Sequence, residues 1–152
     1  MANSQAMCTN YKVDIQNGIH AFGASVVRAT TTKDAFKAAL YLATASLGAA
    51  TAAYSATGEV TGTNYVAGGV AVTTATAPTS TGTTAFFTPS ASIVYTNVTL
   101  ATAFDAVLIY NDTAAGKNAV SVHTFGSQTV TAGTFTLTMP ANDATNALIR
   151  IA

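Results

Sequence analysis

The 152-residue chain carries six basic and six acidic side chains, so its formal net charge is zero, and only 8% of its residues are charged. A typical soluble domain has about 25% charged residues. The length predicts one domain with one core. A surface so poor in charge is weakly protected against association, so we expect a protein that is held in an assembly.

The same composition argues against several classes of partner. No stripe of Lys and Arg is present to neutralise phosphates, so nucleic-acid binding is not predicted. No apolar run reaches the roughly 18 residues of a membrane-spanning helix, and the first residues do not read as a signal peptide. We therefore expect a protein made in a cytoplasm, with no nucleic-acid or membrane partner.

The N-terminal residues 1–23 are predicted to form an amphipathic helix or arm that precedes a single β domain over residues 24–152. Asn3 or Ser4 could cap the helix, and Gly23 could end it. Cys8 would lie in this helix as a small buried apolar group or, alternatively, as a contact thiol between subunits. The apolar stripe could pack on the chain's own β domain or on a neighbouring subunit. It consists of Met7, Tyr11, Ile15, Ile19 and Phe22.

From residue 26 onward the apolar period shifts towards two. Residues 35–47 could form a helix because Ala is abundant and Asp34 could cap it, but the alternation favours a strand. Residues 111–118 read as a loop in which Gly116 is available for a positive φ. The clearest hairpin is expected around Ala132 and Gly133. The other strands are expected at residues 65–76, 84–87, 93–100, 104–110, 119–125 and 147–151.

Seven or eight short strands with Gly and Asn turns predict a mainly β protein, an antiparallel β-sandwich or a jelly-roll or barrel-like domain. Residues 73–84, rich in Thr, are expected to form a long surface loop or a ragged edge. No internal repeat or domain linker is evident.

The sequence predicts no enzyme. Glu59 is the only Glu, the Asp residues are far apart, and His20 and His123 lack a catalytic motif. One Cys and two distant His residues do not suggest a zinc site, and no phosphate loop or nucleophile elbow occurs. We expect no catalytic residue, no metal and no cofactor. Glu59 itself could accept backbone N–H groups or pair with Arg28 or Arg150, or could instead recognise a partner.

The segment Gly-Glu-Val-Thr-Gly-Thr-Asn-Tyr-Val-Ala-Gly-Gly, within residues 54–70, resembles a segment that recurs in small virion structural proteins of tailed bacteriophages. Residues 104–111 resemble the central strand of that group. Residues 119–126, 131–140 and 148–151 resemble its closing strands. The resemblance covers roughly residues 36 to 152, and the order of its pieces is more specific than any one piece.

The resemblance implies a particle component, and the composition favours a capsid cement (decoration) protein on the capsid surface of the virion. Its partners would be the major capsid protein and copies of itself, as a dimer or trimer. The stripe Met7, Tyr11, Ile15, Ile19 and Phe22 is the candidate capsid-docking element. The candidate contacts between copies are Glu59, Thr61, Asn64, Tyr65, Thr79 and Thr81.

Two other functions stay open. A head–tail connector or tail protein would differ from a cement protein in copy number. A receptor- or glycan-binding module would need aromatic platforms, for which five tyrosines are available, although core packing fits them better. They are Tyr41, Tyr54, Tyr65, Tyr95 and Tyr110.

Overall fold

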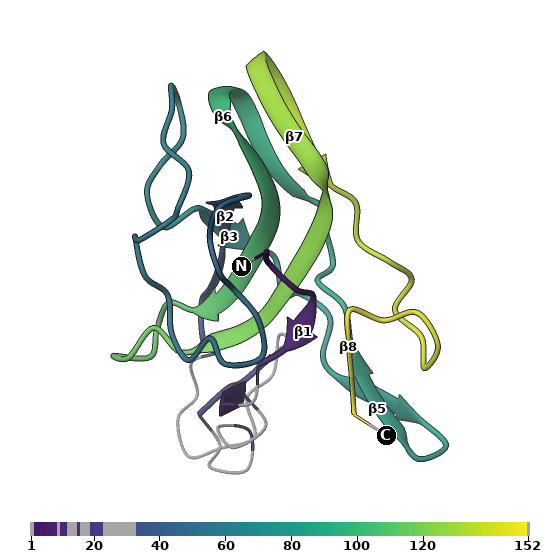
Figure 1. Cartoon of the computed structure of the whole chain (residues 1–152). Helices are drawn as coiled ribbons and strands as arrows, with labels where there is room; N and C mark the ends of the chain where they lie inside the picture. Colours follow the sequence, from purple (N-terminus) through teal and green to yellow (C-terminus); the bar gives the residue numbers. More distant parts are fainter. Residues whose placement is uncertain (1, 9, 12–14, 16–18, 23–32, 152) are drawn as a thin grey trace.

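The computed structural model describes residues 2–8, 10–11, 15, 19–22 and 33–151. This part of the chain is mainly β, as predicted, and its strands form two antiparallel sheets (Figure 1). The five-stranded sheet has the order β1-β7-β6-β2-β3, and the three-stranded sheet has the order β4-β5-β8. The strands are β1 (Ala6–Met7), β2 (Phe36–Leu42), β3 (Val70–Val72), β4 (Thr79–Thr81), β5 (Thr84–Phe87), β6 (Ile93–Asn111), β7 (Ala119–Leu137) and β8 (Ile149–Ile151).

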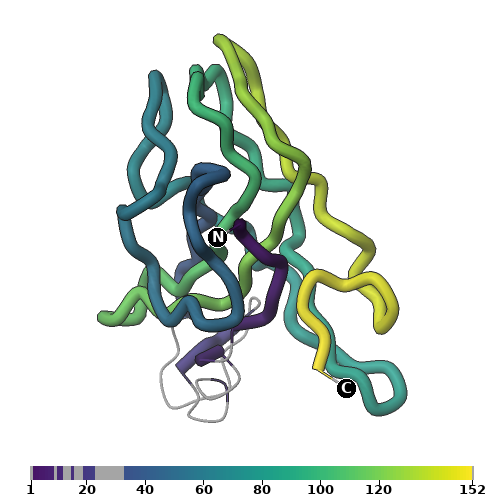
Figure 2. The backbone as a smooth tube through the Cα atoms, in the orientation of Figure 1, coloured from purple at the N-terminus to yellow at the C-terminus, as the bar shows by residue number. Residues whose placement is uncertain are grey.

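A long two-stranded ribbon, made of β6 and β7, dominates the fold. Its two 19-residue strands pair from Ile93 and Leu137 at one end to Tyr110 and Ala119 at the other. The register shifts repeatedly between Tyr95 and Ala106 of β6. Such bulges bend a strand pair, and the ribbon folds back on itself at the end drawn at the top of Figure 2.

The bend divides the ribbon into two halves. The proximal half, residues 104–111 with 119–124, belongs to the centre of the five-stranded sheet. The distal half, residues 93–98 with 133–137, returns over it. Phe135 of the distal half therefore contacts Phe104 and Phe125, with ring centroids 5.0 and 5.3 Å apart.

The predicted hairpin at Ala132 and Gly133 is wrong. β7 runs through both residues, and Gly133 pairs with Val98 of β6. Ala132 does take a positive φ of 45°, and Asn97 on the partner strand takes one of 52°. Both strands thus bend together at this point, so the local signal of a turn marks a bend within a continuous ribbon.

β2 settles the choice between helix and strand for residues 35–47 in favour of a strand, which ends at Leu42. It lies between β3 and β6 and is buried on both faces. Ala38 and Ala39, both fully buried, keep those faces thin enough for layers to pack on each side. Leu40, Leu108 and Val122 form part of the same core.

Other predicted strands are shorter or better defined. Only Val70–Val72 of residues 65–76 is a strand, whereas Thr84–Phe87 matches its prediction. The Thr-rich segment contains β4, which pairs with β5 across Gly82. Residues 112–118 connect β6 and β7 as the expected loop, but Lys117, at φ 47°, takes the positive φ rather than Gly116.

The N-terminal segment differs from a helix that begins near Asn3. Met7 lies in β1, which pairs with Ser121 and Val122 of β7. Asn3 does not cap a helix, because its side chain bonds the backbone of Leu42 and Leu47 and the Asp105 carboxylate. Asn10, Tyr11 and Ile15 are helical, whereas Ile19 and Phe22 have irregular backbone. The predicted helix otherwise falls largely on residues 9, 12–14 and 16–18, outside the described part.

Candidate functional site

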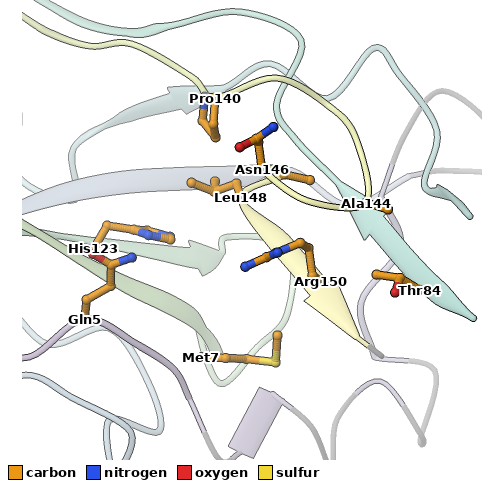
Figure 3. A pocket seen from close by; sticks show the side chains of 10 residues that line it. Gln5, Met7, Thr84, His123, Pro140, Ala144, Asn146, Leu148 and Arg150 are labelled. Atoms are coloured by element: carbon orange, nitrogen blue, oxygen red, sulfur yellow. The ribbon is translucent and has the colours of Figure 1, made fainter. Parts of the chain in front are cut away.

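A pocket lies where the N-terminal segment leaves the edge of β7. Its volume is about 660 Å³, and its walls come from both sheets and from the segment before β8. Figure 3 shows Arg150 extending from β8 towards the side on which Gln5 and His123 lie. The lining residues are Gln5, Met7, Thr84, His123, Pro140, Ala144, Asn146, Ala147, Leu148 and Arg150.

His123 of this pocket and Ser121 behind it resemble a base with a nucleophile. Ser121 and His123, two residues apart on one face of β7, approach to 2.8 Å between Oγ and Nε2. Burial lowers the pKa of His123 to about 4, so its imidazole is neutral at neutral pH. Ser121, however, is only 3% exposed. A nucleophile needs access to its substrate, so this geometry fits a structural hydrogen bond inside the sheet.

Arg150 is the cation of the pocket, and its guanidinium donates a hydrogen bond to the Thr145 carbonyl. This bond ties β8 to the turn before it. In that turn the Asp143 carboxylate accepts the backbone N–H groups of Thr145 and Asn146. The pocket can therefore accommodate a polar group beside Arg150, but its own polar side chains are engaged chiefly in holding the C-terminal segment.

One well-organised polar group among the described residues is a buried carboxylate. Glu59 is 7% exposed. Its Oε2 accepts the Tyr54 hydroxyl at 2.6 Å, and its Oε1 accepts the Tyr65 hydroxyl and the Gly68 N–H, both at 2.7 Å. The sequence predicted that Glu59 could accept backbone N–H groups, and the structure shows one such bond, from Gly68. The hydroxyls of two tyrosines donate to the same carboxylate.

These contacts link the loop of residues 58–69 to the core sheet. The Tyr65 hydroxyl also accepts the Leu40 N–H of β2 at 3.0 Å, and Tyr110 of β6 donates to the Gly68 carbonyl at 2.9 Å. We call Glu59, Tyr54, Tyr65, Gly68 and Tyr110 the Glu59 cluster. Burial raises the pKa of Tyr110 to about 12, so its hydroxyl stays protonated and can donate.

The candidate residues for contacts between copies fall in different places. Glu59 and Tyr65 belong to the Glu59 cluster and face inward. Thr61 and Asn64 are exposed on the same loop, where the Asn64 side chain donates to the Asn97 carbonyl at the bend of β6. Thr79 and Thr81 are exposed in β4, in the other sheet.

The candidate docking stripe is also divided. Tyr11 is 3% exposed, and Phe22 stacks on Phe36 with ring centroids 4.6 Å apart. Met7 lines the pocket, whereas Ile15 packs half-buried against the core and Ile19 is half-buried. The aromatic members thus pack on the chain's own domain. A docking role for the stripe stays a prediction.

Sequence reasoning named Glu59, Tyr54 and Tyr65 as candidate residues, but it paired neither tyrosine with Glu59 and did not pair Ser121 with His123. Two residues on one face of a strand are visible as an i, i+2 spacing, and this was the available signal for Ser121 and His123. Tyr54 and Tyr65 flank Glu59 along the chain, but nothing in the sequence shows that both hydroxyls turn to its carboxylate.

Within the described residues, no three His, Cys, Asp or Glu side chains lie close enough to hold a metal ion. None of the helical structure found there is long and apolar enough to cross a membrane. Comparison of the chain with protein-family models, curated proteins and solved structures found no match.

Proposed function

We propose that the chain is a structural component of a bacteriophage particle, and specifically a capsid cement protein of the mature head. It would bind across junctions between major capsid protein subunits and oppose their separation. A protein that binds only the assembled shell stabilises that state by mass action. Many copies on a symmetric shell compensate for a weak single contact.

One observation carries the proposal: the chain presents long stretches of uncharged surface. No charged residue occurs between Glu59 and Asp105 or between Lys117 and Asp143. The exposed residues of these stretches are mainly Thr, Ser, Ala and Gly, as in residues 126–129. Contact residues of this kind need little desolvation and lose little side-chain entropy, which suits a surface covered by other subunits.

The charges of the described part are largely used within the chain. Glu59 is enclosed by its cluster, and the buried Asp34 accepts the Asn111 side-chain amide at 2.8 Å. Asp112 lies between Lys37 and Lys117, at 3.2 and 2.8 Å. Few charges remain to keep copies apart, which supports a function in an assembly.

The finer architecture belongs to this proposal as well. We interpret the bent β6–β7 ribbon as the element that joins two layers of a β-sandwich, because its distal half packs over its proximal half. A compact sandwich with a neutral surface can be repeated around a shell without rearranging. Docking through the N-terminal stripe would then depend mainly on Ile15 and Ile19, which pack less completely than Tyr11.

Copy number per particle tests the proposal. Quantitative protein gels of purified virions, and of heads separated from tails, should give hundreds of copies that follow the major capsid protein. A few copies that follow the tail would replace the cement function with the connector or tail alternative. Absence from purified particles would overturn both.

The glycan-binding alternative finds less support in the geometry. Tyr41, Tyr95 and Tyr110 are each no more than 2% exposed. Tyr54 and Tyr65 donate hydrogen bonds to Glu59 through their hydroxyls. A sugar platform needs an exposed aromatic face, so these tyrosines are better explained as core residues, and a glycan-binding assay with the isolated protein should give no signal.

A further inference from the structure

The outer edge of β7 is the longest strand edge that the described part of the chain leaves open. β7 pairs with β6 along its length on one side. On the other side β1 pairs only with Ser121 and Val122. The edge strands of the two sheets are short: β1 has two residues, and β3, β4 and β8 have three each. Short edges are poor templates for added strands.

The chain protects the rest of this ribbon in two recognisable ways. Bulges distort the stretch of β7 that pairs with β6 between Leu100 and Ala106, and a distorted edge accepts a new strand poorly. On the far side of the ribbon, Thr63 and Thr99 exchange two backbone hydrogen bonds of 3.1 Å, which cover the β6 edge at Thr99.

Neither device covers the last part of β7. Residues 135–137 pair with residues 93–95 of β6 in unbroken register. Among the described residues, no strand pairs with their outer side. We call residues 133–138 on this side the distal edge. It also lacks charged side chains and Pro, the residues that usually discourage pairing between edges.

We propose that the distal edge is a self-association site, at which the same edge of a second copy adds in antiparallel orientation about a two-fold axis. This inference rests on the proposed function only for its expectation that copies touch one another. The edge and its chemistry are properties of the chain alone. The main-chain hydrogen bonds of added strands would supply the affinity.

The side chains determine which registers are compatible with pairing. Thr134 and Thr136 are exposed, whereas Phe135 and Leu137 are half-buried and pack against the core. A two-fold axis at Thr136 places Phe135 opposite Leu137 of the second copy and Thr134 opposite Thr138. An axis at Phe135 places Thr134 opposite Thr136 and Phe135 opposite its own copy, so Thr again faces Thr and apolar side chains stay together. A shift by one residue would place Thr opposite the apolar side chains, and pairing would lose that match.

Charge favours a second copy as the occupant. In any two-fold arrangement each residue faces itself or a near neighbour, so a charged edge would place like charges opposite each other. The distal half of the ribbon contains no charged residue on either strand. A second copy therefore meets no electrostatic penalty, and it provides an edge of the same length and pattern.

Thr136→Lys tests the inference, with Thr102→Lys as its control. Both residues are exposed, but Thr102 lies on β6 at the bend, away from the distal edge. Sedimentation equilibrium over a concentration series should show a dimer for the unchanged protein and for Thr102→Lys. For Thr136→Lys, two ammonium groups would face each other with the axis at Thr136 and would be diagonal neighbours with the axis at Phe135, so the dissociation constant should rise at least about tenfold.

Cysteine crosslinking locates the contact independently of stability. Cys8 is buried and burial raises the pKa of its thiol to about 11, so the native thiol should stay unreactive. With the axis at Thr136, Thr136→Cys alone and a mixture of Thr134→Cys with Thr138→Cys should give disulfide-linked dimers on mild oxidation, because these residues face each other across the axis. With the axis at Phe135, a mixture of Thr134→Cys with Thr136→Cys should crosslink instead, and Thr102→Cys should not crosslink in either case. Circular dichroism confirms that each variant is folded.

A chain that stays monomeric at all concentrations overturns the inference, as does a dimer that crosslinks at none of the three edge positions. These results leave the particle copy number unaffected, so the proposed cement function would stand or fall separately. Conversely, edge crosslinking in a protein that is absent from particles would keep this inference and remove the proposed function.

Discussion

The loop of residues 58–69 and the distal half of the β6–β7 ribbon are neighbours that use opposite chemistry. The loop contains a buried carboxylate with three donors at 2.6–2.7 Å. The distal ribbon has no charged residue and alternates exposed Thr with half-buried apolar side chains. One region is fixed inward by specific polar bonds, and the other presents neutral strand surface outward.

This difference explains how a chain with so few charges can hold one conformation and still suit an assembly. A buried charge is costly unless it is fully hydrogen-bonded, so Glu59 specifies how the loop must lie on β2. An exposed charge would instead keep subunits apart. The loop contains a buried, hydrogen-bonded charge, and the distal half of the ribbon carries no exposed charge.

Gly69→Ala should reduce the free energy of unfolding most, because it directly disturbs the contact between the loop and β2. Gly69 has a φ of 76°, and a Cβ there would lie 1.7 Å from the Ala38 carbonyl oxygen of β2. The backbone must move, so we expect a loss of more than about 4 kcal/mol in the free energy of unfolding, or no folded protein. Urea unfolding followed by circular dichroism measures it.

Gly126→Ala is the matched control on the ribbon. Nothing lies within 4 Å of the position that its Cβ would take. Its effect should stay within about 0.5 kcal/mol, as for other exposed positions. If the two substitutions lowered the free energy of unfolding equally, the contrast between a loop packed closely on β2 and an open ribbon would be contradicted.

Glu59→Ala is expected to be the next most damaging change. It leaves the Tyr54 and Tyr65 hydroxyls and the Gly68 N–H without their acceptor. Unsatisfied buried donors cost about 1–3 kcal/mol each, and water entering the space left by the side chain offsets part of that, so we expect a loss of about 3 kcal/mol. Glu59→Gln, which keeps one oxygen acceptor, should cost less. A loss below about 1 kcal/mol for Glu59→Ala would show that the cluster does not hold the loop.

The pH dependence of stability should report His123, which is half-buried and lines the pocket. Its pKa falls from the ordinary 6.5 to about 4 in the folded chain because burial disfavours the charged ring. The unfolded chain therefore binds a proton first as the pH falls, and stability is complete above pH 6.5 and declines between 6.5 and 4. Because solvent near the ring weakens the effect, we expect His123 to lower the free energy of unfolding by about 2 kcal/mol over this pH range.

His123→Gln isolates that contribution. It removes the ionisable ring, while the other titrating groups, His20 included, remain in both proteins. Urea unfolding at pH 7 and pH 4.5 should therefore show a smaller difference for the variant. The same difference in both proteins would mean that His123 is not the group responsible.

The sequence could predict the parts of the fold that depend on local patterns. β5, β8 and the loop after β6 follow from alternation and turn residues, and the mainly β class follows from their number. The long ribbon did not, because Ala132-Gly133 read locally as a hairpin turn and residues 93–100 and 104–110 read as two separate strands. Only pairing between β6 and β7 shows that the chain bends there within continuous strands, and pairing over such a distance leaves no mark in the sequence.

The candidate sites show a similar limit. Glu59 was noticeable because charge is scarce, but whether it faced inward or outward depended on where Tyr54 and Tyr65 lie after folding. The apolar spacing of Met7, Tyr11 and Phe22 correctly marked residues that need cover. It could not show that Met7 joins β7 as a strand, because a two-residue strand has no period of its own.

The weakest expected effect concerns the charges that remain near the surface. Asp112 accepts hydrogen bonds from Lys117 and Lys37, which hold the pKa of its carboxyl below the ordinary range. Its side chain and those of both lysines are partly exposed, so solvent screens the attraction. Asp112→Asn should therefore cost less than about 1 kcal/mol, and added salt should shrink the cost further. Urea unfolding at low and high salt measures both. A cost as large as that of Glu59→Ala would mean that position in the fold, rather than enclosure by donors, decides what a charge contributes in this chain.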